Sequence, residues 1–278
     1  MCFSHILPFL FHFLYNEHIK LEVDTMKIKH CIRCILMLLI IIAIWQFASM
    51  NTLPLFVPSP RSVFDAGVEL ILSGALLKGL QYSFVRITVA TLISVGLAIP
   101  ISLIIYSVPF FRETIMPIAS ILRYVPVTAF SPLLVLWFGI DETAKVSFLV
   151  IATFVYFLPS VLLCYEEVSD DLLDTGKTMG MNLFERIFEI LIPACLPSIC
   201  NMLLVMYSVG WNYIAIVEAT NAKYGLGYII EVSSARGRTA VVFAAIIAIM
   251  IFSFIIDKIG NIAIRKIFKW RYVNDSVE

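Results

Sequence analysis

The stretch SDDLLDTGKTMGMNLFERIFEILIP, residues 169–193, is a polar interruption between two long apolar segments. It contains Gly176-Lys177-Thr178, the tripeptide that ends a phosphate-binding loop. Such a loop also needs a glycine five residues earlier, so that backbone N–H groups can surround the phosphates, and here that residue is Asp171. A carboxylate would repel phosphate, and the residues upstream are acidic rather than typical of a buried strand. The sequence therefore argues against a nucleotide site in this stretch.

Local signals predict a helical hairpin here instead. Ser169 suits the cap of a first helix, and Gly180 suits its left-handed end. Asn182 and Glu185 have the spacing of a capping pair that opens a second helix, which Pro193 is expected to close. The first helix would carry an apolar stripe. This stripe fits two interpretations equally well: the helix lies on the membrane surface as a connector, or it inserts into a groove on a soluble partner. The stripe consists of Leu172, Leu173, Gly176 and Met179.

Composition indicates an integral membrane protein. The chain has 278 residues, of which 60% are hydrophobic and 14% charged, and its mean hydropathy is +0.94. A soluble domain of this size could not bury so much apolar surface. The formal net charge is zero, so nothing favours nucleic acid as a partner, whereas a lipid bilayer is expected around most of the chain.

Six apolar stretches are long enough to cross a bilayer as helices, which takes about 20 residues each. Apart from Arg33 at the very start of the first stretch, Arg86 and Arg123 are the two charged side chains inside them, each near one end of its stretch. Prolines 117, 126, 132 and 159 are expected to kink these helices rather than break them. The predicted spans lie near residues 32–48, 82–105, 115–137, 146–163, 196–217 and 240–256.

Basic residues at both ends of the chain predict the orientation. Lys27, Lys29 and Arg33 flank the start of the first span, and four basic residues between 265 and 271 follow the last. An even number of spans places both termini on one side, which is therefore expected to be the cytoplasm. The loop at 166–193 would then be cytoplasmic and the loop at 219–238 external.

These signals divide the chain into segments. Residues 1–25 are interpreted as an N-terminal extension, either a short interfacial helix or, the favoured reading, untranslated sequence before a true start at Met26. Residues 26–50 hold the first span, residues 51–81 an external segment, residues 82–265 the main core, and residues 266–278 a cytoplasmic tail. A shortened chain that starts at Met26 is expected to insert and transport as well as the full chain.

The hairpin resembles a known motif. Asp174-Thr175-Gly176, then Gly180, then Ile190-x-Ile192-Pro193 is similar to the "EAA" loop of ABC importer permeases. The spacing matches throughout, whereas Asp replaces Glu, Thr and Gly replace two Ala, and Ile192 replaces Leu. Gly176 inside a helix costs about 1 kcal/mol relative to alanine, which predicts a softer coupling helix than is usual.

Three other segments resemble permeases for sulfonates, taurine and nitrate in matching order, so that the resemblance covers roughly residues 35–260. They are LPLFVPSPRSVF (53–64), LRYVPVTAFSPLLVLWFGIDETAK (122–145) and VGWNYIAIVEATNAKYGLGYII (209–230).

The resemblance implies an all-α type I importer permease fold, with a five-helix core and one N-terminal helix. It implies a dimer with a second permease copy, two ATP-binding subunits and an external solute-binding protein. ATP and Mg would be bound by the ATPase partner, so no cofactor, metal or catalytic residue is expected in this chain. The residues expected to couple to the ATPase are Leu172, Leu173, Asp174, Thr175, Gly176, Met179, Gly180, Ile190 and Pro193.

A second group of residues is a candidate pore or gate. Glu218 is an ionisable residue where the fifth span ends, and it is interpreted as structural or gating because a bare carboxylate would repel an anion. Arg123 either attracts an anion or, the favoured reading, neutralises the cytoplasmic interface. The other candidates are Trp211 and Tyr213 beside Glu218, and the turn glycines Gly225 and Gly227.

Two other classes are the alternatives. A secondary transporter or channel would tend to show inverted repeats and mid-membrane charges, and a membrane enzyme would need a histidine and carboxylate cluster. The sequence favours neither, since all four histidines lie within the first 30 residues and Cys31-x-x-Cys34 has no second pair. The solute stays open among sulfonate, taurine, nitrate and molecules similar to thiamine precursors.

Overall fold

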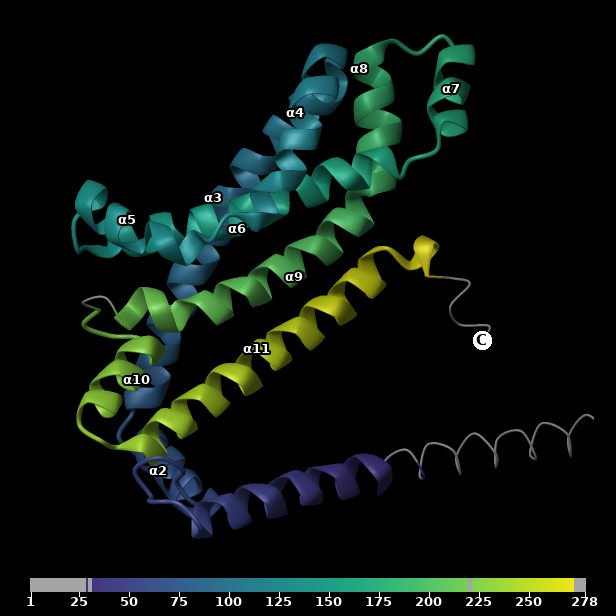
Figure 1. Ribbon diagram of the computed structural model, residues 1–278. Coiled ribbons are helices and arrows are strands. Elements are labelled where there is room, and N and C mark those ends of the chain that lie inside the picture. Colours follow the sequence, from purple (N-terminus) through teal and green to yellow (C-terminus); the bar gives the residue numbers. More distant parts are fainter. Residues whose placement is uncertain (1–28, 30–31, 220–221, 273–278) are drawn as a thin grey trace, which may run out of the picture. The chain divides into compact units, whose positions relative to one another are not determined.

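The structure is a computed structural model that describes residue 29 and residues 32–219 and 222–272, and these are helical with short connections (Figure 1). The expectations for residues 1–25 lie outside the described residues. By its internal contacts the chain divides into two units, Met1–Val63 and Phe64–Glu278.

In the first unit, the described residues form one long apolar helix, Ile32–Met50, of 19 residues. It is long enough to cross a membrane, which agrees with the first predicted span. After the helix, the backbone turns, and the indole Nε1 of Trp45 donates a hydrogen bond of 3.0 Å to the carbonyl of Pro58. This bond ties the segment after the helix back to the helix itself.

Four long helices form the framework of the second unit: α3 (Ala75–Ser107), α6 (Glu142–Glu166), α9 (Ile192–Ala219) and α11 (Thr239–Ile267). Each contains one of the predicted spans, and each is long and apolar enough to cross a bilayer. The helix α2 (Pro60–Leu72) precedes α3, and shorter helices connect the long ones: α4 (Pro109–Ile121), α5 (Ser131–Phe138) and α10 (Leu226–Ala235). Pro159 lies inside the continuous α6, as expected of a proline that kinks a helix without breaking it.

The third predicted span is broken, which corrects the expectation that its prolines would only kink it. The segments Pro109–Tyr124 and Val127–Phe138 meet at 83°. The break falls at Val125 and Pro126, where Val125 has extended backbone (φ −69°, ψ 120°). A residue before proline is sterically driven out of the helical region, so the chain turns here. The described residues therefore contain five spanning helices, or six if this bent pair is one span.

Small side chains let α3 and α6 approach closely. Ala90, Ser94 and Ala98 on α3 are buried, as is Ala152 on α6. The hydroxyl of Ser94 donates a hydrogen bond of 2.9 Å to the carbonyl of Val150. Packing of small residues and hydrogen bonds between helices holds membrane helices together where lipid removes the hydrophobic drive.

Two buried apolar clusters fill the bundle. One gathers around Phe157, Tyr165 and Leu191, and the first helix of the hairpin adds a residue to it. The other gathers around Ile87 and Trp211 and includes Leu226 of α10. Figure 1 shows the hairpin at one end of the bundle and α10 at the other, so each cluster supports one of the two regions described next.

Candidate functional site

The predicted hairpin exists, and its first helix is α7 (Asp170–Thr178). Ser169 has the extended backbone of a cap (φ −61°, ψ 137°), although its hydroxyl makes no capping bond. Gly180 has φ 80° and ends the helix as predicted. The N–H of Met181 donates to the carbonyl of Gly176, and that of Gly180 to Lys177, both at 3.0 Å. This pair of bonds satisfies the last carbonyls of α7.

The second helix of the hairpin opens with the predicted capping box. The N–H of Glu185 donates to Oδ1 of Asn182 at 2.9 Å, and the N–H of Asn182 donates to the Glu185 carboxylate at 2.7 Å. The helix continues from α8 (Leu183–Glu185) through a π-helical turn (Arg186–Leu191) directly into α9. The expectation that Pro193 closes this helix was therefore wrong. A wide turn just before proline relieves its clash with the preceding carbonyl, so the helix runs on.

The apolar stripe of α7 divides between two faces. Leu173 packs against the buried cluster of the bundle, and Gly176 is buried against the second helix. Leu172 and Met179, which are seven residues apart and share a face, are 43% and 75% exposed. The inward pair anchors the hairpin, and the outward pair leaves an apolar surface free for a partner.

Gly176 packs closely against the second helix of the hairpin. A Cβ on this residue would lie 2.6 Å from Cδ1 of Ile190 and 3.1 Å from Cγ of Arg186. Ile190, the isoleucine of the motif, thus supports α7 from the second helix. The absence of a side chain at Gly176 lets α7 lie directly against Ile190 and Arg186. The softening predicted for this helix stays a prediction.

Gly176→Leu is expected to destabilise the permease by about 1–3 kcal/mol through overpacking against Ile190. Gly176→Ala should be nearly neutral, because the end of Ile190 can move and alanine gains about 1 kcal/mol of helix propensity. Thermal unfolding of the purified chain measures both, with exposed Thr178→Leu as the control on the same helix. Full stability of Gly176→Leu would contradict the close packing.

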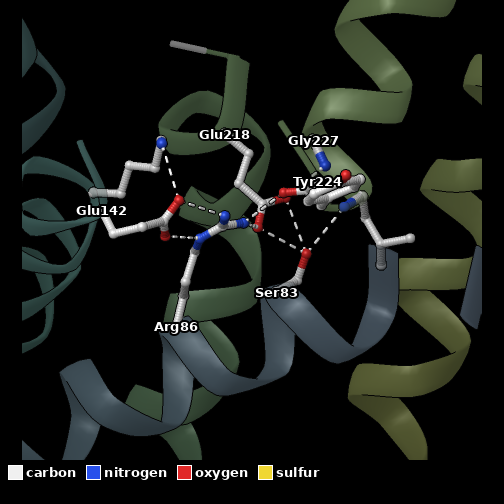
Figure 2. Close-up of polar contacts among 8 residues, drawn as sticks. Ser83, Arg86, Glu142, Glu218, Tyr224 and Gly227 are labelled. Atoms are coloured by element: carbon white, nitrogen blue, oxygen red, sulfur yellow. Dashed lines mark hydrogen bonds and ion pairs between the residues drawn. The ribbon is translucent and has the colours of Figure 1, made fainter. Parts of the chain in front are cut away.

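A buried charge cluster lies at the other end of the bundle, centred on Glu218 of α9 (Figure 2). The Glu218 side chain is fully buried, and Arg86 Nη1 donates to Oε1 at 2.6 Å. The hydroxyl of Ser83 lies 2.8 and 2.9 Å from its two oxygens, and the N–H of Gly227 donates to Oε2 at 2.8 Å. Ser83 in turn accepts from the N–H of Leu226 at 3.0 Å. The carboxylate is thus neutralised and hydrogen-bonded on both oxygens.

The two glycines of the 225–227 turn enclose the same carboxylate. Gly225 has φ 141°, a conformation that favours glycine, and a Cβ there would collide with the Glu218 carboxylate. A Cβ on Gly227 would lie 2.7 Å from Cβ of Glu218 and 2.8 Å from the carbonyl of Ala215. Both glycines therefore act by allowing α10 to lie on Glu218.

Arg86 joins this buried pair to a second carboxylate at the surface. Arg86 Nε and Nη2 donate to the two oxygens of Glu142 at 2.6 and 2.8 Å, and Nη1 also donates to the carbonyl of Tyr224 at 2.7 Å (Figure 2). Lys145 Nζ lies 3.2 Å from the same Glu142 carboxylate. The cluster therefore connects α3, α6, α9 and the segment before α10.

The comparisons with known proteins identify the family. Residues 90–269 match the family described as binding-protein-dependent transport system inner membrane component, which is well over half of the chain. The chain belongs to this family. Its relatives are ABC transporter permeases, and the chain is a permease subunit of an ABC importer.

Two curated permeases illustrate the likeness in sequence. The chain is 29% identical over 219 residues to the taurine transport system permease protein TauC of Escherichia coli, covering 77% of this chain and 80% of that one. It is 29% identical over 237 residues to the putative aliphatic sulfonates transport permease protein SsuC of Bacillus subtilis, covering 84% and 85%.

Solved structures agree on the fold. The inward-facing MetNI methionine ABC transporter matches with a TM-score of 0.60 at 20% identity, covering 68% of this permease and 94% of the matched chain. An amino acid ABC transporter matches with a TM-score of 0.56 at 18% identity, covering 73% and 97%. The permease therefore has the type I importer fold that the resemblance implied.

Unlike Gly225 and Gly227, the remaining candidate residues Arg123, Trp211 and Tyr213 do not join Glu218 in one polar site. Trp211 is buried and packs edge-on against Phe252 at 5.3 Å, while Tyr213 packs against Phe148 at 5.9 Å. Arg123 lies in the short 3-10 turn Leu122–Tyr124 beside the 83° break and is half-buried. Trp211 and Tyr213 thus have packing contacts, whereas the Glu218 carboxylate is surrounded by hydrogen-bond donors and a paired cation.

Sequence reasoning did not connect Glu218 with Ser83, Arg86, Glu142 and Lys145. Arg86 gave the one available signal, because it is an arginine inside an apolar span and such a residue usually has a partner. Among the described residues, no group of three or more His, Cys, Asp or Glu side chains is placed to hold a metal.

Proposed function

We propose that the permease forms the path for a small oxyanion, delivered by an external binding protein and driven by ATP hydrolysed on a separate subunit. An organic sulfonate such as taurine is the favoured cargo, because the two permeases described above are named for taurine and for aliphatic sulfonates. Nitrate is the inorganic alternative. In this proposal the chain itself binds neither ATP nor Mg and hydrolyses nothing.

The observation that carries the proposal is the exposed face of α7. Leu172 and Met179 present apolar side chains on a short helix that is fixed from behind by Leu173 and Gly176. A rigid helix with an apolar face suits insertion into a groove of a soluble subunit. A second copy of the permease would complete the path and provide a second docking helix.

The charge cluster removes an objection to an anionic cargo. A bare carboxylate near the path would repel an anion, but Glu218 is buried and paired with Arg86. The cluster therefore leaves no uncompensated negative charge at Glu218.

Reconstituted uptake tests the proposal. The permease in liposomes with its ATPase and binding protein is expected to accumulate taurine or another small sulfonate only when ATP is present on the ATPase side. Uptake that follows an ion gradient without the ATPase would favour the alternative, a secondary transporter or channel.

The proposed orientation predicts which loop is accessible from outside. In a chain without its native cysteines, a cysteine at exposed position 223 should react with an impermeant maleimide in intact cells. A cysteine at exposed position 177 should react only after the cells are permeabilised. Labelling of position 177 alone in intact cells would reverse the topology.

A further inference from the structure

Two buried cations converge on one exposed carboxylate at the edge of the charge cluster. The side chains of Arg86 and Lys145 are 5% and 6% exposed, whereas that of Glu142 is 60% exposed. Arg86 holds Glu142 through two parallel N–H donors, and Lys145 binds one of the same oxygens. This is the geometry with which a guanidinium recognises any planar or tetrahedral oxyanion.

The N–H groups of Arg86 stay in place whichever oxyanion they bind. The other edge of Arg86 is fixed by the Glu218 carboxylate and the carbonyl of Tyr224 at 2.6 and 2.7 Å. Glu218 is itself held by Ser83 and Gly227. Arg86 is therefore a preorganised donor, and Glu142 is the exposed side of the pair.

A pocket of about 780 Å³ lies directly at this pair, and Arg86, Glu142 and Lys145 all line it. Its volume is within the range of small-molecule sites, about 300–1,000 Å³. One wall is formed by the stacked rings of Tyr82 and Tyr224, whose centroids are 5.0 Å apart. Such a wall can cover the apolar part of an organic anion while the cations hold its charged end.

The charge balance shows what Glu142 contributes. Arg86, Lys145 and Lys223 supply three positive charges to the pocket and the cluster behind it, and Asp141, Glu142 and Glu218 supply three negative ones. Without the charge of Glu142, one positive charge remains, and it lies on buried groups where water screens it least.

We propose that Arg86 and Lys145 form a binding site for the transported oxyanion, and that the Glu142 carboxylate occupies this site when the oxyanion is absent. The identity of the cargo rests on the proposed function, whereas the site rests on the geometry of Arg86, Glu142 and Lys145. An arriving sulfonate places two oxygens where the carboxylate oxygens of Glu142 lie and releases Glu142 to water.

The exchange explains why a strong anion site need not trap its cargo. Glu142 belongs to the same chain and competes at a fixed, high effective concentration. A transport site must bind well enough to admit the solute and weakly enough to release it. Return of Glu142 to Arg86 provides the release.

Binding of methanesulfonate to the purified full-length permease tests the site. Glu142→Gln removes the competing charge, so the Glu142 carboxylate no longer fills the site. The dissociation constant of this variant for methanesulfonate should therefore be on the order of tenfold lower than that of the natural chain. Adding Lys145→Gln to this variant should remove the gain. The affinity for methanesulfonate is measured by thermal stabilisation with the anion and by equilibrium dialysis of the labelled anion.

Three controls separate the site from general ionic effects. Glu69→Gln breaks an exposed ion pair with Arg238, 2.9 Å long and outside the pocket, and should leave binding unchanged. Neutral methanesulfonamide should bind no better to Glu142→Gln than to the natural chain. Glu142→Ser is the second variant if the glutamine variant is unstable, since it also removes the charge.

The proposal is overturned if folded Glu142→Gln and Glu142→Ser bind methanesulfonate no more tightly than the natural chain does. It is equally overturned if Glu69→Gln gains as much. Reconstituted uptake distinguishes this failure from a failure of the proposed function: ATP-driven sulfonate uptake without the binding gain refutes this site alone, whereas binding gain without any ATP-driven uptake refutes the proposed function alone.

Discussion

Arg86→Met is expected to lower the stability of the permease by roughly 3–5 kcal/mol, because it leaves a buried carboxylate without its charged partner. Glu218 is fully buried, and Arg86 is the one cation that contacts it among the described residues. Ser83 and Gly227 would still donate hydrogen bonds, but they carry no charge. The carboxylate would have to take up a proton or draw water into the bundle.

A thiol-reactive fluorophore can follow unfolding in a variant that keeps only Cys164 and Cys195, both of which are buried. The matched control is Arg238→Met, whose pair with Glu69 is exposed on both sides and should be worth about 0–1 kcal/mol. Arg86→Met combined with Glu218→Met should recover most of the loss, because an apolar pair of similar volume often replaces a buried ion pair without cost. Equal stability of Arg86→Met and Arg238→Met would show that Glu218 does not depend on Arg86.

Met179→Asp is expected to weaken binding of the ATPase subunit more than a hundredfold. Met179 is 75% exposed in the permease and touches no described core, so an aspartate there leaves the free chain folded. In the proposed complex it would bury an unpaired charge, which costs several kcal/mol, and even about 2.8 kcal/mol is a hundredfold in affinity. Transport and stimulated ATP hydrolysis should fall together while the permease still reaches the membrane.

Two neighbouring variants make the test specific. Lys177→Ala should change little, because the side chain is exposed and pairs only locally with Asp174. Leu173→Asp should instead destabilise the permease itself, since Leu173 packs against the bundle. The docking proposal fails if Met179→Asp binds the ATPase normally, or if the isolated permease binds ATP and Lys177→Ala abolishes that binding.

The sequence predicted those features that depend on neighbours along the chain. Helix ends at Gly180 and at the Asn182–Glu185 box follow from backbone preferences and local hydrogen bonds, and the structure has both. The spans follow from length and apolar composition alone. The family resemblance depended on spacing within short motifs, and the family match confirms it.

Features that depend on distant contacts were not predictable in the same way. Glu218 and Arg86 are 132 positions apart, and Arg86 and Glu142 are 56 apart. Leu172 and Leu173 are chemically identical, and only the contact of α7 with the bundle decides which one points outward. The break at Val125 and Pro126 likewise depended on how far the local preference of one residue would redirect a whole span.

A single helix, Leu183–Ala219, joins the hairpin to the buried charge cluster. Its 37 residues follow a path of about 55 Å at 1.5 Å per residue, and its α8 part runs in a different direction from α9 (Figure 1). The hairpin lies at one end of this path and Glu218 near the other. A tilt of α9 by about 10° around its middle would displace each end of its 28 residues by roughly 4 Å, far more than the hydrogen bonds of Glu218 can stretch. We therefore expect a movement of the hairpin to strain the Arg86–Glu218 contact through the backbone of this one helix.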